Sequence, residues 1–169
     1  MSLDDWNQRY RTRDTLDEQP AAMLVEALEG VPPGRALDLA CGAGRNAVWL
    51  AREGWEVVAL DGADEAIRLL REREPSIDAR VYNLEAGAAL PFENASFDLV
   101  VILYYLHRPL FAEAKRLVRP GGLVVTAALM TGRFAAKPGE LVQHFECFEV
   151  LRQQESEISE LVVRRFGVR

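Results

Sequence analysis

Two acidic residues and two glycines between positions 38 and 61 are the residues of this chain best suited to chemistry. Residues 36–51, ALDLACGAGRNAVWLA, run from an apolar strand-like segment through a glycine-bearing turn into an amphipathic segment. Gly42 and Gly44 let backbone N–H groups at the start of a helix approach a ligand with no Cβ in the way. This arrangement is typical of a loop that binds a nucleotide or a nucleoside.

The two acidic residues distinguish between possible ligands. The segment GAGRNA at 42–47 satisfies the dinucleotide pattern GxGxxG/A, and Asp61 follows Gly44 by 17 residues. Asp38, at the end of the preceding strand, would repel a pyrophosphate but can hold an ammonium group, directly or through water. Asp61 is placed for a bidentate grip on two ribose hydroxyls. Asp38 therefore favours a nucleoside that carries an amino group over a dinucleotide.

The segments around this loop alternate between apolar runs and helical patterns, which is typical of a parallel sheet with helices on its faces. Five nearly continuous apolar runs are predicted as strands that are buried on both sides. These runs span residues 35–40, 55–60, 79–84, 97–105 and 122–129.

Helices are predicted at 64–74 and 139–145, and a third carries an apolar stripe that ends before the helix-breaking segment 119–122, RPGG. The stripe consists of Leu110, Ala114, Leu117 and Val118. Two final strand-like runs, 147–156 and 160–168, are too close for a parallel crossover and are expected to pair as an antiparallel hairpin. The expected fold class is α/β: a Rossmann-like doubly wound sheet of about seven strands, five parallel plus the C-terminal hairpin, with helices on both faces.

Composition limits the partners. The 169 residues suit one globular domain, and the net charge of −6 without any basic run makes nucleic acid or an anionic membrane an unexpected partner. The first ten residues lack the pattern of a signal peptide and no apolar stretch is long enough to span a membrane, so the expected location is cytoplasmic. Cys41 and Cys147 are interpreted as reduced thiols, and no spacing indicates a metal site.

Residues 30–130 resemble a class I S-adenosylmethionine-dependent methyltransferase. The family's first motif, (D/E)xGxGxG, appears here as DLACGAG at 38–44, with Ala40 in the first glycine position. Segments FDLVVILYYLH and VRPGGLVV resemble two later motifs of the family, in the same order along the chain. The segment WNQRY at 6–10 and the late KPGELVQHF further resemble the tellurite-resistance and thiopurine type of small-molecule methyltransferase.

The resemblance implies a cofactor, S-adenosylmethionine, and a set of contacts for it. Asn83 stands where the family often has an aspartate that binds adenine, and its side-chain carbonyl can still accept from the adenine amino group. The full set of expected cofactor contacts is Asp38, Ala40, Gly42, Gly44, Asn46, Asp61, Gly62, Asn83, Leu84, Glu85, Leu103, Tyr10 and Arg11.

His107 and Tyr104 are the expected catalytic residues, since ligands of open α/β sheets bind beyond the carboxyl ends of the strands. His107 alternatively caps the following helix, and Tyr104 and Tyr105 would face opposite sides if the strand continued. Trp6 and Tyr10 would share a helix face, either in a lid or in the core. Arg11 alternatively lies on a solvated face, and Asn46 alternatively caps the helix after the loop.

The resulting hypothesis is methyl transfer to a small-molecule acceptor by in-line displacement, driven by positioning and exclusion of water. Two other classes remain open: a non-catalytic domain that binds S-adenosylmethionine or S-adenosylhomocysteine, and a nicotinamide-dependent oxidoreductase. The expected organisation is a single methyltransferase domain, 1–169. Its parts are a helical lid or cap at 1–30, a cofactor-binding core at 31–130, and a terminal helix with the hairpin at 131–169. The oligomeric state is left open.

Overall fold

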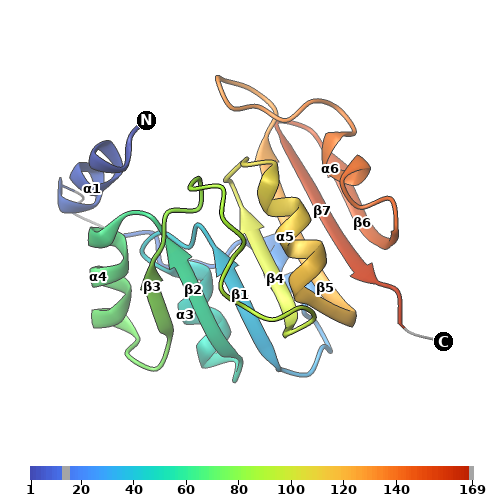
Figure 1. The fold of residues 1–169 in the computed structure, drawn as a ribbon, viewed down its shortest axis with the longest axis horizontal. Helices are drawn as coiled ribbons and strands as arrows, with labels where there is room; N and C mark the ends of the chain where they lie inside the picture. The colour runs from blue at the N-terminus through green and yellow to red at the C-terminus, as the bar shows by residue number, and fades with distance from the viewer. Residues whose placement is uncertain (13–15, 168–169) are drawn as a thin grey trace. The chain divides into compact units, whose positions relative to one another are not determined.

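A computed structural model describes residues 1–12 and 16–167 of the chain (Figure 1). The chain divides into two compact units, Met1–Ala86 and Gly87–Arg169. Together they contain the seven strands of a Rossmann-like mixed sheet, which confirms the predicted fold class.

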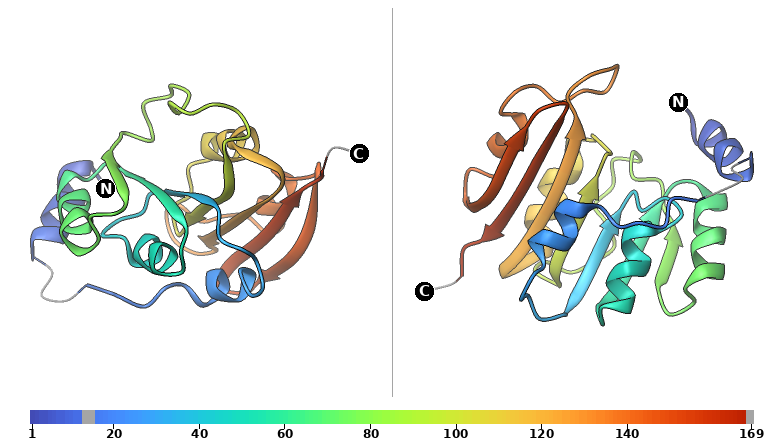
Figure 2. Two further views of the ribbon diagram at one scale, coloured as in Figure 1. Left: turned by 90° about the horizontal axis from the view of Figure 1, so that it is seen from below. Right: turned by 180° about the vertical axis from the view of Figure 1, so that it is seen from behind.

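The first unit is a parallel sheet in the order β3-β2-β1 with four helices. Its strands are β1 (Arg35–Leu39), β2 (Glu56–Asp61) and β3 (Asp78–Val81), and its helices are α1 (Leu3–Thr12), α2 (Ala22–Ala27), α3 (Arg45–Arg52) and α4 (Asp64–Arg73). Helix α3 packs on β1 and β2, and it stands in front of these strands when they are viewed from behind (Figure 2). Helix α4 packs on β2 and β3.

The strand register of this unit places three loops at one edge of its sheet. Asp38 of β1 pairs with Ala59 of β2, and Asp61 at the end of β2 pairs with Val81 at the end of β3. Because parallel strands end on the same side, the loops after all three strands lie together. These loops contain most of the residues expected to bind the cofactor.

Strand β3 differs from its prediction. It ends at Val81 rather than at residue 84, and Val81 is 49% exposed. The prediction of burial on both sides is wrong for this strand because β3 is the edge of the sheet, with β2 as its neighbour. Residues 82–85 consequently lie beyond the end of the strand and form a loop.

The second unit contains strands in the order β4-β5-β7-β6 and two helices. Its strands are β4 (Phe97–Leu103), β5 (Val118–Leu129), β6 (Phe148–Glu155) and β7 (Ile158–Arg165), and its helices are α5 (Pro109–Leu117) and α6 (Glu140–Gln143). Strands β6 and β7 pair antiparallel, as predicted for the terminal hairpin. Residue 168, the predicted end of that hairpin, lies outside the described residues.

The segment 119–122 behaves differently from its prediction. Helix α5 ends at Leu117, but β5 already begins at Val118, so that RPGG belongs to the strand. The pairing of β5 with β4 jumps between Val118 and Leu123, which makes this segment a bulge. Gly122 has no room for a side chain there, since a Cβ would lie 2.8 Å from the carbonyl oxygen of Asp98.

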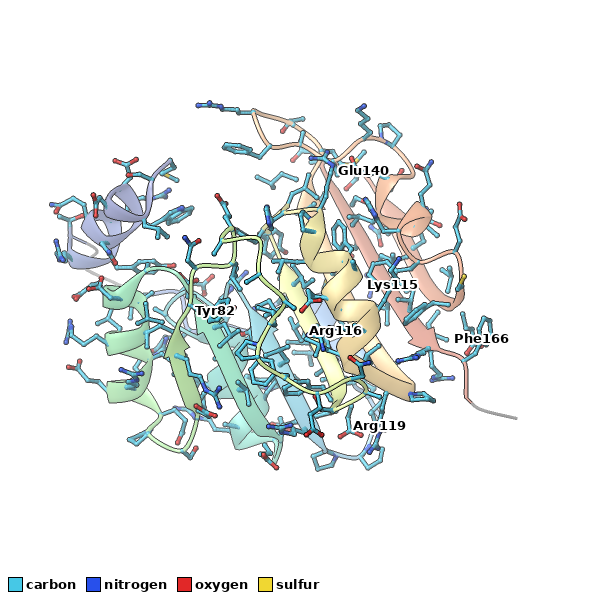
Figure 3. All side chains as sticks on the ribbon, viewed as in Figure 1. Tyr82, Lys115, Arg116, Arg119, Glu140 and Phe166 are labelled. Atoms are coloured by element: carbon cyan, nitrogen blue, oxygen red, sulfur yellow. The ribbon has the colours of Figure 1, made fainter. Side chains whose placement is uncertain are left out.

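Arg116 of α5 organises the loop that precedes β4. Its guanidinium donates to the carbonyl oxygens of Leu90 and Phe92 at 3.0 and 2.8 Å, and to the side chain of Asn94 at 3.0 Å. Glu113 pairs with the same guanidinium at 2.7 Å and also accepts the N–H of Leu90. Figure 3 labels Arg116 on the helix that carries it.

Candidate functional site

Asp38 carries a buried carboxyl group in the first unit. It lies near the end of β1, just before the glycine loop. Asp38 is only 2% exposed. Among the described residues its Oδ2 atom is a buried oxygen that lacks a hydrogen-bond partner. A buried acceptor without a partner costs about 1–3 kcal/mol, so its presence indicates a group that the folded chain does not itself supply.

The charge state of Asp38 follows from its surroundings. Burial, and then the negative charge of Asp61, raise the pKa of Asp38 to about 8, although the positive charge of Arg45 opposes the rise. The Cys41 thiol is affected by the same surroundings: burial, then Asp38 and Asp61, hold its pKa well above the ordinary range. Both groups are therefore neutral at pH 7 in the absence of a cation.

Asp61 connects the loops that follow β1 and β2. Its Oδ2 accepts the backbone N–H of Gly42 at 2.8 Å, and its Oδ1 accepts that of Ala63 at 2.8 Å. Burial raises the pKa of Asp61, and hydrogen bonds from the backbone N–H groups of Ala63, Gly42 and Gly62 oppose that rise. A carboxylate has about four acceptor positions, so each oxygen keeps capacity for a further donor such as a hydroxyl.

The glycine loop has a backbone that ordinary residues adopt at a cost. Ala40, Gly42 and Gly44 have φ angles of +58°, +55° and +86°, all in the left-handed region. A Cβ on Gly44 would collide with Leu70 of α4, so this glycine is required by helix packing. A Cβ on Gly42 would lie 2.5 Å from the hydroxyl oxygen of Tyr10. The three positions that match the family's glycine motif thus have different local reasons for being small.

Helix α1 lies over these loops. Its Asn7 side chain accepts the N–H of Glu65 at 3.1 Å, and its Leu3 would lie 2.6 Å from a Cβ placed on Gly62. The rings of Trp6 and Tyr10 stack with centroids 6.3 Å apart, as the shared helix face predicts. None of the residues of α1 is buried, so core packing does not explain this aromatic pair. The assignment of this helix as a lid or cap stays a prediction.

The chain after α1 is attached to the same loop by polar contacts. Arg45 pairs with Asp17 at 2.7 Å, and the side-chain oxygen of Asn46 accepts the N–H of Ala21 at 2.9 Å. Asn46 does not cap its own helix, because α3 begins at Arg45 with Gly44 as its cap. Its side chain instead holds the segment before α2.

Two residues that the sequence did not predict contact the glycine loop and the start of α4. Arg73, at the end of α4, donates to the carbonyl oxygen of Ala43 at 2.8 Å. Asn7, as described above, binds the first turn of α4 from a position 58 residues away. Neither residue belongs to a local pattern, so nothing near it in the sequence indicates its partner.

The loop after β3 holds the remaining residues expected in the first unit. The Asn83 side-chain oxygen accepts the N–H of Glu85 at 3.0 Å, which forms a local turn with both residues exposed. Leu84 is 9% exposed. The backbone N–H of Tyr82, labelled in Figure 3, donates to the carbonyl oxygen of Asp61 at 2.8 Å and keeps this loop beside the end of β2. Arg11 is exposed, and its charge helps to lower the pKa of Glu65.

The second unit holds the residues expected to face the acceptor. Leu103 is buried at the end of β4, and Tyr104 follows with a φ of +59° and 40% exposure. The predicted strand stops there, so the expected alternation of Tyr104 and Tyr105 does not occur. An aromatic residue in the left-handed region is uncommon, and such strained residues cluster at functional sites. The N–H of Tyr104 is anchored on the carbonyl oxygen of Ala127 at 2.8 Å.

His107 lies just before α5, whose cap residue is Arg108. The carbonyl oxygen of His107 accepts the N–H of Leu110 at 2.9 Å, so its backbone, and not its imidazole, supports the start of the helix. The imidazole ring is half-buried and lies 6.4 Å from the ring of Tyr105, centroid to centroid.

No helix within 1–12 and 16–167 is both long and apolar enough to cross a membrane. The same part of the chain contains no group of three or more histidine, cysteine or acidic residues arranged to hold a metal ion. Cys41 and Cys147 are both free cysteines, in agreement with their interpretation as thiols.

Comparison with known proteins establishes the family. A family model described as a methyltransferase domain matches residues 36–122, about half of the chain. The chain belongs to this family, and the resemblance to class I S-adenosylmethionine-dependent methyltransferases is confirmed. The matched range includes the glycine loop, Asp61 and the end of β4. Membership in this family overturns the alternative of a nicotinamide-dependent oxidoreductase.

Sequence relatives agree with the family. A demethylmenaquinone methyltransferase from Renibacterium salmoninarum is 36% identical over 110 residues, which cover 62% of this chain and 45% of that protein. The chain spans about half the length of the curated relatives it matches.

Solved structures of similar fold cover nearly all of the chain. A TehB-like S-adenosylmethionine-dependent methyltransferase from Corynebacterium glutamicum has a TM-score of 0.74 at 22% identity, covering 96% of this chain and 97% of that one. The N-methyltransferase NodS from Bradyrhizobium japonicum, solved with S-adenosylhomocysteine, has a TM-score of 0.74 at 19% identity, with coverage of 98% and 99%. At these identities the likeness concerns the fold. It agrees at that level with the resemblance to the tellurite-resistance type.

The raised pKa of Asp38 predicts a pH-dependent stability. Between its ordinary value near 4 and about 8, the folded chain keeps a proton on Asp38 that the unfolded chain releases, so stability falls as pH rises through this window. In Asp38→Asn this dependence is lost. The free energy of unfolding of the variant, relative to the natural chain, should therefore grow by about 1.4 kcal/mol per pH unit in this window. Urea unfolding at pH 5, 6 and 7 measures it, and a constant difference would contradict the assignment.

The left-handed Ala40 predicts a stabilising substitution. A left-handed alanine costs about 1–2 kcal/mol, whereas glycine adopts this region freely but loses about 0.5–1 kcal/mol through its larger unfolded-state entropy. Ala40→Gly should therefore raise the free energy of unfolding by up to about 1 kcal/mol. Ala43→Gly is the matched control, because Ala43 has no positive φ and should lose stability. Equal losses in both variants would show that Ala40 is not strained.

Proposed function

We propose that this chain transfers a methyl group from S-adenosylmethionine to a small-molecule acceptor. The observation that carries the proposal is the buried Asp38 oxygen, which lacks a hydrogen-bond partner among the described residues. It lies beside the glycine loop, within the range that the methyltransferase family model matches. An ammonium group is the ligand group that such an oxygen needs, and the methionine part of the cofactor has one. Acidic composition and a net charge of −6 favour a small acceptor over nucleic acid.

The residues of the first unit fit this cofactor. We assign the ammonium group to Asp38 and the ribose hydroxyls to Asp61, whose oxygens keep acceptor capacity. Contacts to the methionine part are assigned to the loop residues Ala40, Gly42 and Gly44. The adenine contacts are assigned to Asn83, Leu84 and Glu85, and further contacts to Gly62, Asn46, Tyr10 and Arg11. Leu103 belongs to the second unit, and its cofactor contact stays a prediction from the sequence.

Two of the residues assigned to the cofactor, Asn83 and Asn46, already use their side-chain oxygens within the protein. The Asn83 side-chain oxygen already accepts the N–H of Glu85, so an adenine amino group would share this oxygen rather than have it alone. Asn46 uses its side-chain oxygen on Ala21 and therefore contributes through its amide nitrogen or by positioning the loop. Tyr10 has the most direct support, because its hydroxyl oxygen already occupies the space next to Gly42.

The chemistry asks little of the protein beyond positioning. When bound, S-adenosylmethionine supplies a methyl group that its sulfonium already activates. The chain's own residues then have to orient a nucleophile in line with that group and keep water away. We assign the acceptor side to Tyr104, held in a strained conformation, and to His107, which can take a proton where the acceptor must lose one.

The names of relatives point to different acceptors. One is named for demethylmenaquinone and another, from Salmonella typhimurium, for malonyl-[acyl-carrier protein]. Our proposal of a small acceptor is consistent with the first name and leaves the attacking atom to experiment.

Binding and turnover test the proposal together. Isothermal titration calorimetry should show binding of S-adenosylmethionine and S-adenosylhomocysteine, and none of NAD. Radiolabelled methyl transfer to a panel of quinols, thiols, amines and metalloid oxyanions should then identify an acceptor. Failure to bind either adenosyl compound would contradict the proposal. Binding without transfer to any acceptor would favour the non-catalytic alternative.

The double hydrogen bond of Asp61 predicts a strong effect of removing its charge. In Asp61→Asn, one carboxylate oxygen becomes an amide nitrogen, so either Gly42 or Ala63 loses the acceptor for its N–H. The ribose hydroxyls assigned to Asp61 lose a charged acceptor as well. Loss of that charge-assisted hydrogen bond, about 1–3 kcal/mol, should weaken S-adenosylhomocysteine binding by roughly tenfold to a hundredfold. Calorimetry measures the change. Asp64→Asn, an exposed acid in α4, is the matched control and should bind normally.

A further inference from the structure

Asp38 is buried near a second acidic residue, Asp61, and one of its carboxyl oxygens lacks a hydrogen-bond donor among the described residues. Its Oδ2 is buried without a hydrogen-bond partner in the described part of the chain. The groups that act on it electrostatically are Asp61, from the end of β2, and Arg45, from the start of α3. Burial, and then the charges of both carboxyl groups, raise the pKa of the neighbouring Cys41 thiol. A negative charge on Asp38 would therefore be repelled by the charge of Asp61, and Arg45 would offset this repulsion only in part.

The two acids differ in what stabilises a charge. Asp61 accepts two backbone N–H groups at 2.8 Å each, so its ionised form is supported by the loops. Within residues 1–12 and 16–167, Oδ2 of Asp38 has no such donor. Arg45, whose charge opposes the rise in the pKa of Asp38, directs its Nη1 atom to Asp17 at 2.7 Å and to the carbonyl oxygen of Gln19 at 3.4 Å. The surroundings therefore assign the negative charge to Asp61 and a neutral state to Asp38.

We propose that Asp38 carries a proton in the ligand-free protein and releases it as the ammonium group of the cofactor enters, so that cofactor binding and proton release are one event. This inference rests on the proposed function, because it concerns the same loop. In the step, the O–H bond of the Asp38 carboxyl breaks and its proton passes to solvent. The resulting carboxylate pairs with the ammonium group, and no electron transfer or further reactant is involved.

The coupling makes binding depend on pH in a direction that can be stated in advance. Asp38, with a pKa of about 8 in the free protein, must lose more protons on binding as pH falls. For one proton with this pKa, affinity should fall about twentyfold between pH 7.5 and pH 6.0. Above pH 8 affinity should fall again, because the ligand's own amino group loses its charge there.

Two probes separate Asp38 from the rest of the site. S-adenosylhomocysteine carries the amino-acid part with its ammonium group, whereas 5′-methylthioadenosine has the same adenosine and a thioether without it. Calorimetry of both probes at pH 6.0, 6.75 and 7.5 gives their affinities. Repeating the titrations at pH 7 in phosphate and in Tris, which differ in ionisation enthalpy, gives the number of protons released. About 0.9 proton is expected for S-adenosylhomocysteine and none for 5′-methylthioadenosine.

Variants locate the proton. Asp38→Asn should bind S-adenosylhomocysteine more weakly at pH 7.5, with no dependence on pH and no proton release. Its affinity for 5′-methylthioadenosine should be unchanged, which also shows that the variant is folded. Asp64→Asn, the exposed control in α4, should keep the full pH dependence of the natural chain.

The outcomes distinguish this inference from the proposed function. Affinity for S-adenosylhomocysteine that does not change with pH overturns the inference and leaves the methyltransferase proposal intact. Equal pH dependence for both probes also overturns it, because the titrating group would then lie outside the ammonium site. If neither probe binds, the proposed function fails and the inference fails with it.

Discussion

The burial of one carboxyl group at the end of β1 is the constraint on which the cofactor loop depends. Asp38 is 2% exposed and its Oδ2 has no partner in the described part of the chain, so folding alone leaves it unsatisfied. A protein gains nothing in stability from such a group. A cationic ligand would supply the missing partner of the Asp38 oxygen. The buried carboxyl group is therefore explained by the cofactor binding that we propose.

Asp61 shows how the same loop is kept open for that ligand. By accepting N–H groups from the loops after β1 and β2, it holds two separate chain segments at one sheet edge. Helix α1 and the segment around Asp17 then approach from outside and contact Gly42, Glu65 and Arg45. The hydrogen bonds of Asp61 thus hold the two loops together, and α1 and the segment around Asp17 contact them from the exposed side.

The features of the fold and of the loop that follow local rules could be predicted from the sequence. The apolar runs, the stripe of α5 and the short gap of the hairpin gave the fold class, and the spacing of Asp38, Gly42, Gly44 and Asp61 gave the loop. The edge position of β3 and the bulge at 119–122 depend on strand neighbours, which local patterns do not contain. The same holds for Asn7 and Arg73, whose partners are distant in the chain, and for the left-handed Tyr104.

The carbon-13 resonance of the Asp38 carboxyl group offers the most direct measurement of the central claim. Followed by NMR from pH 4 to 9.5, it should titrate near pH 8 in the ligand-free protein, because burial opposes ionisation. With saturating S-adenosylhomocysteine it should show an ionised carboxylate already at pH 6. A ligand-free titration near the ordinary value of about 4 would contradict the account, since Asp38 would then have a partner that stabilises its charge.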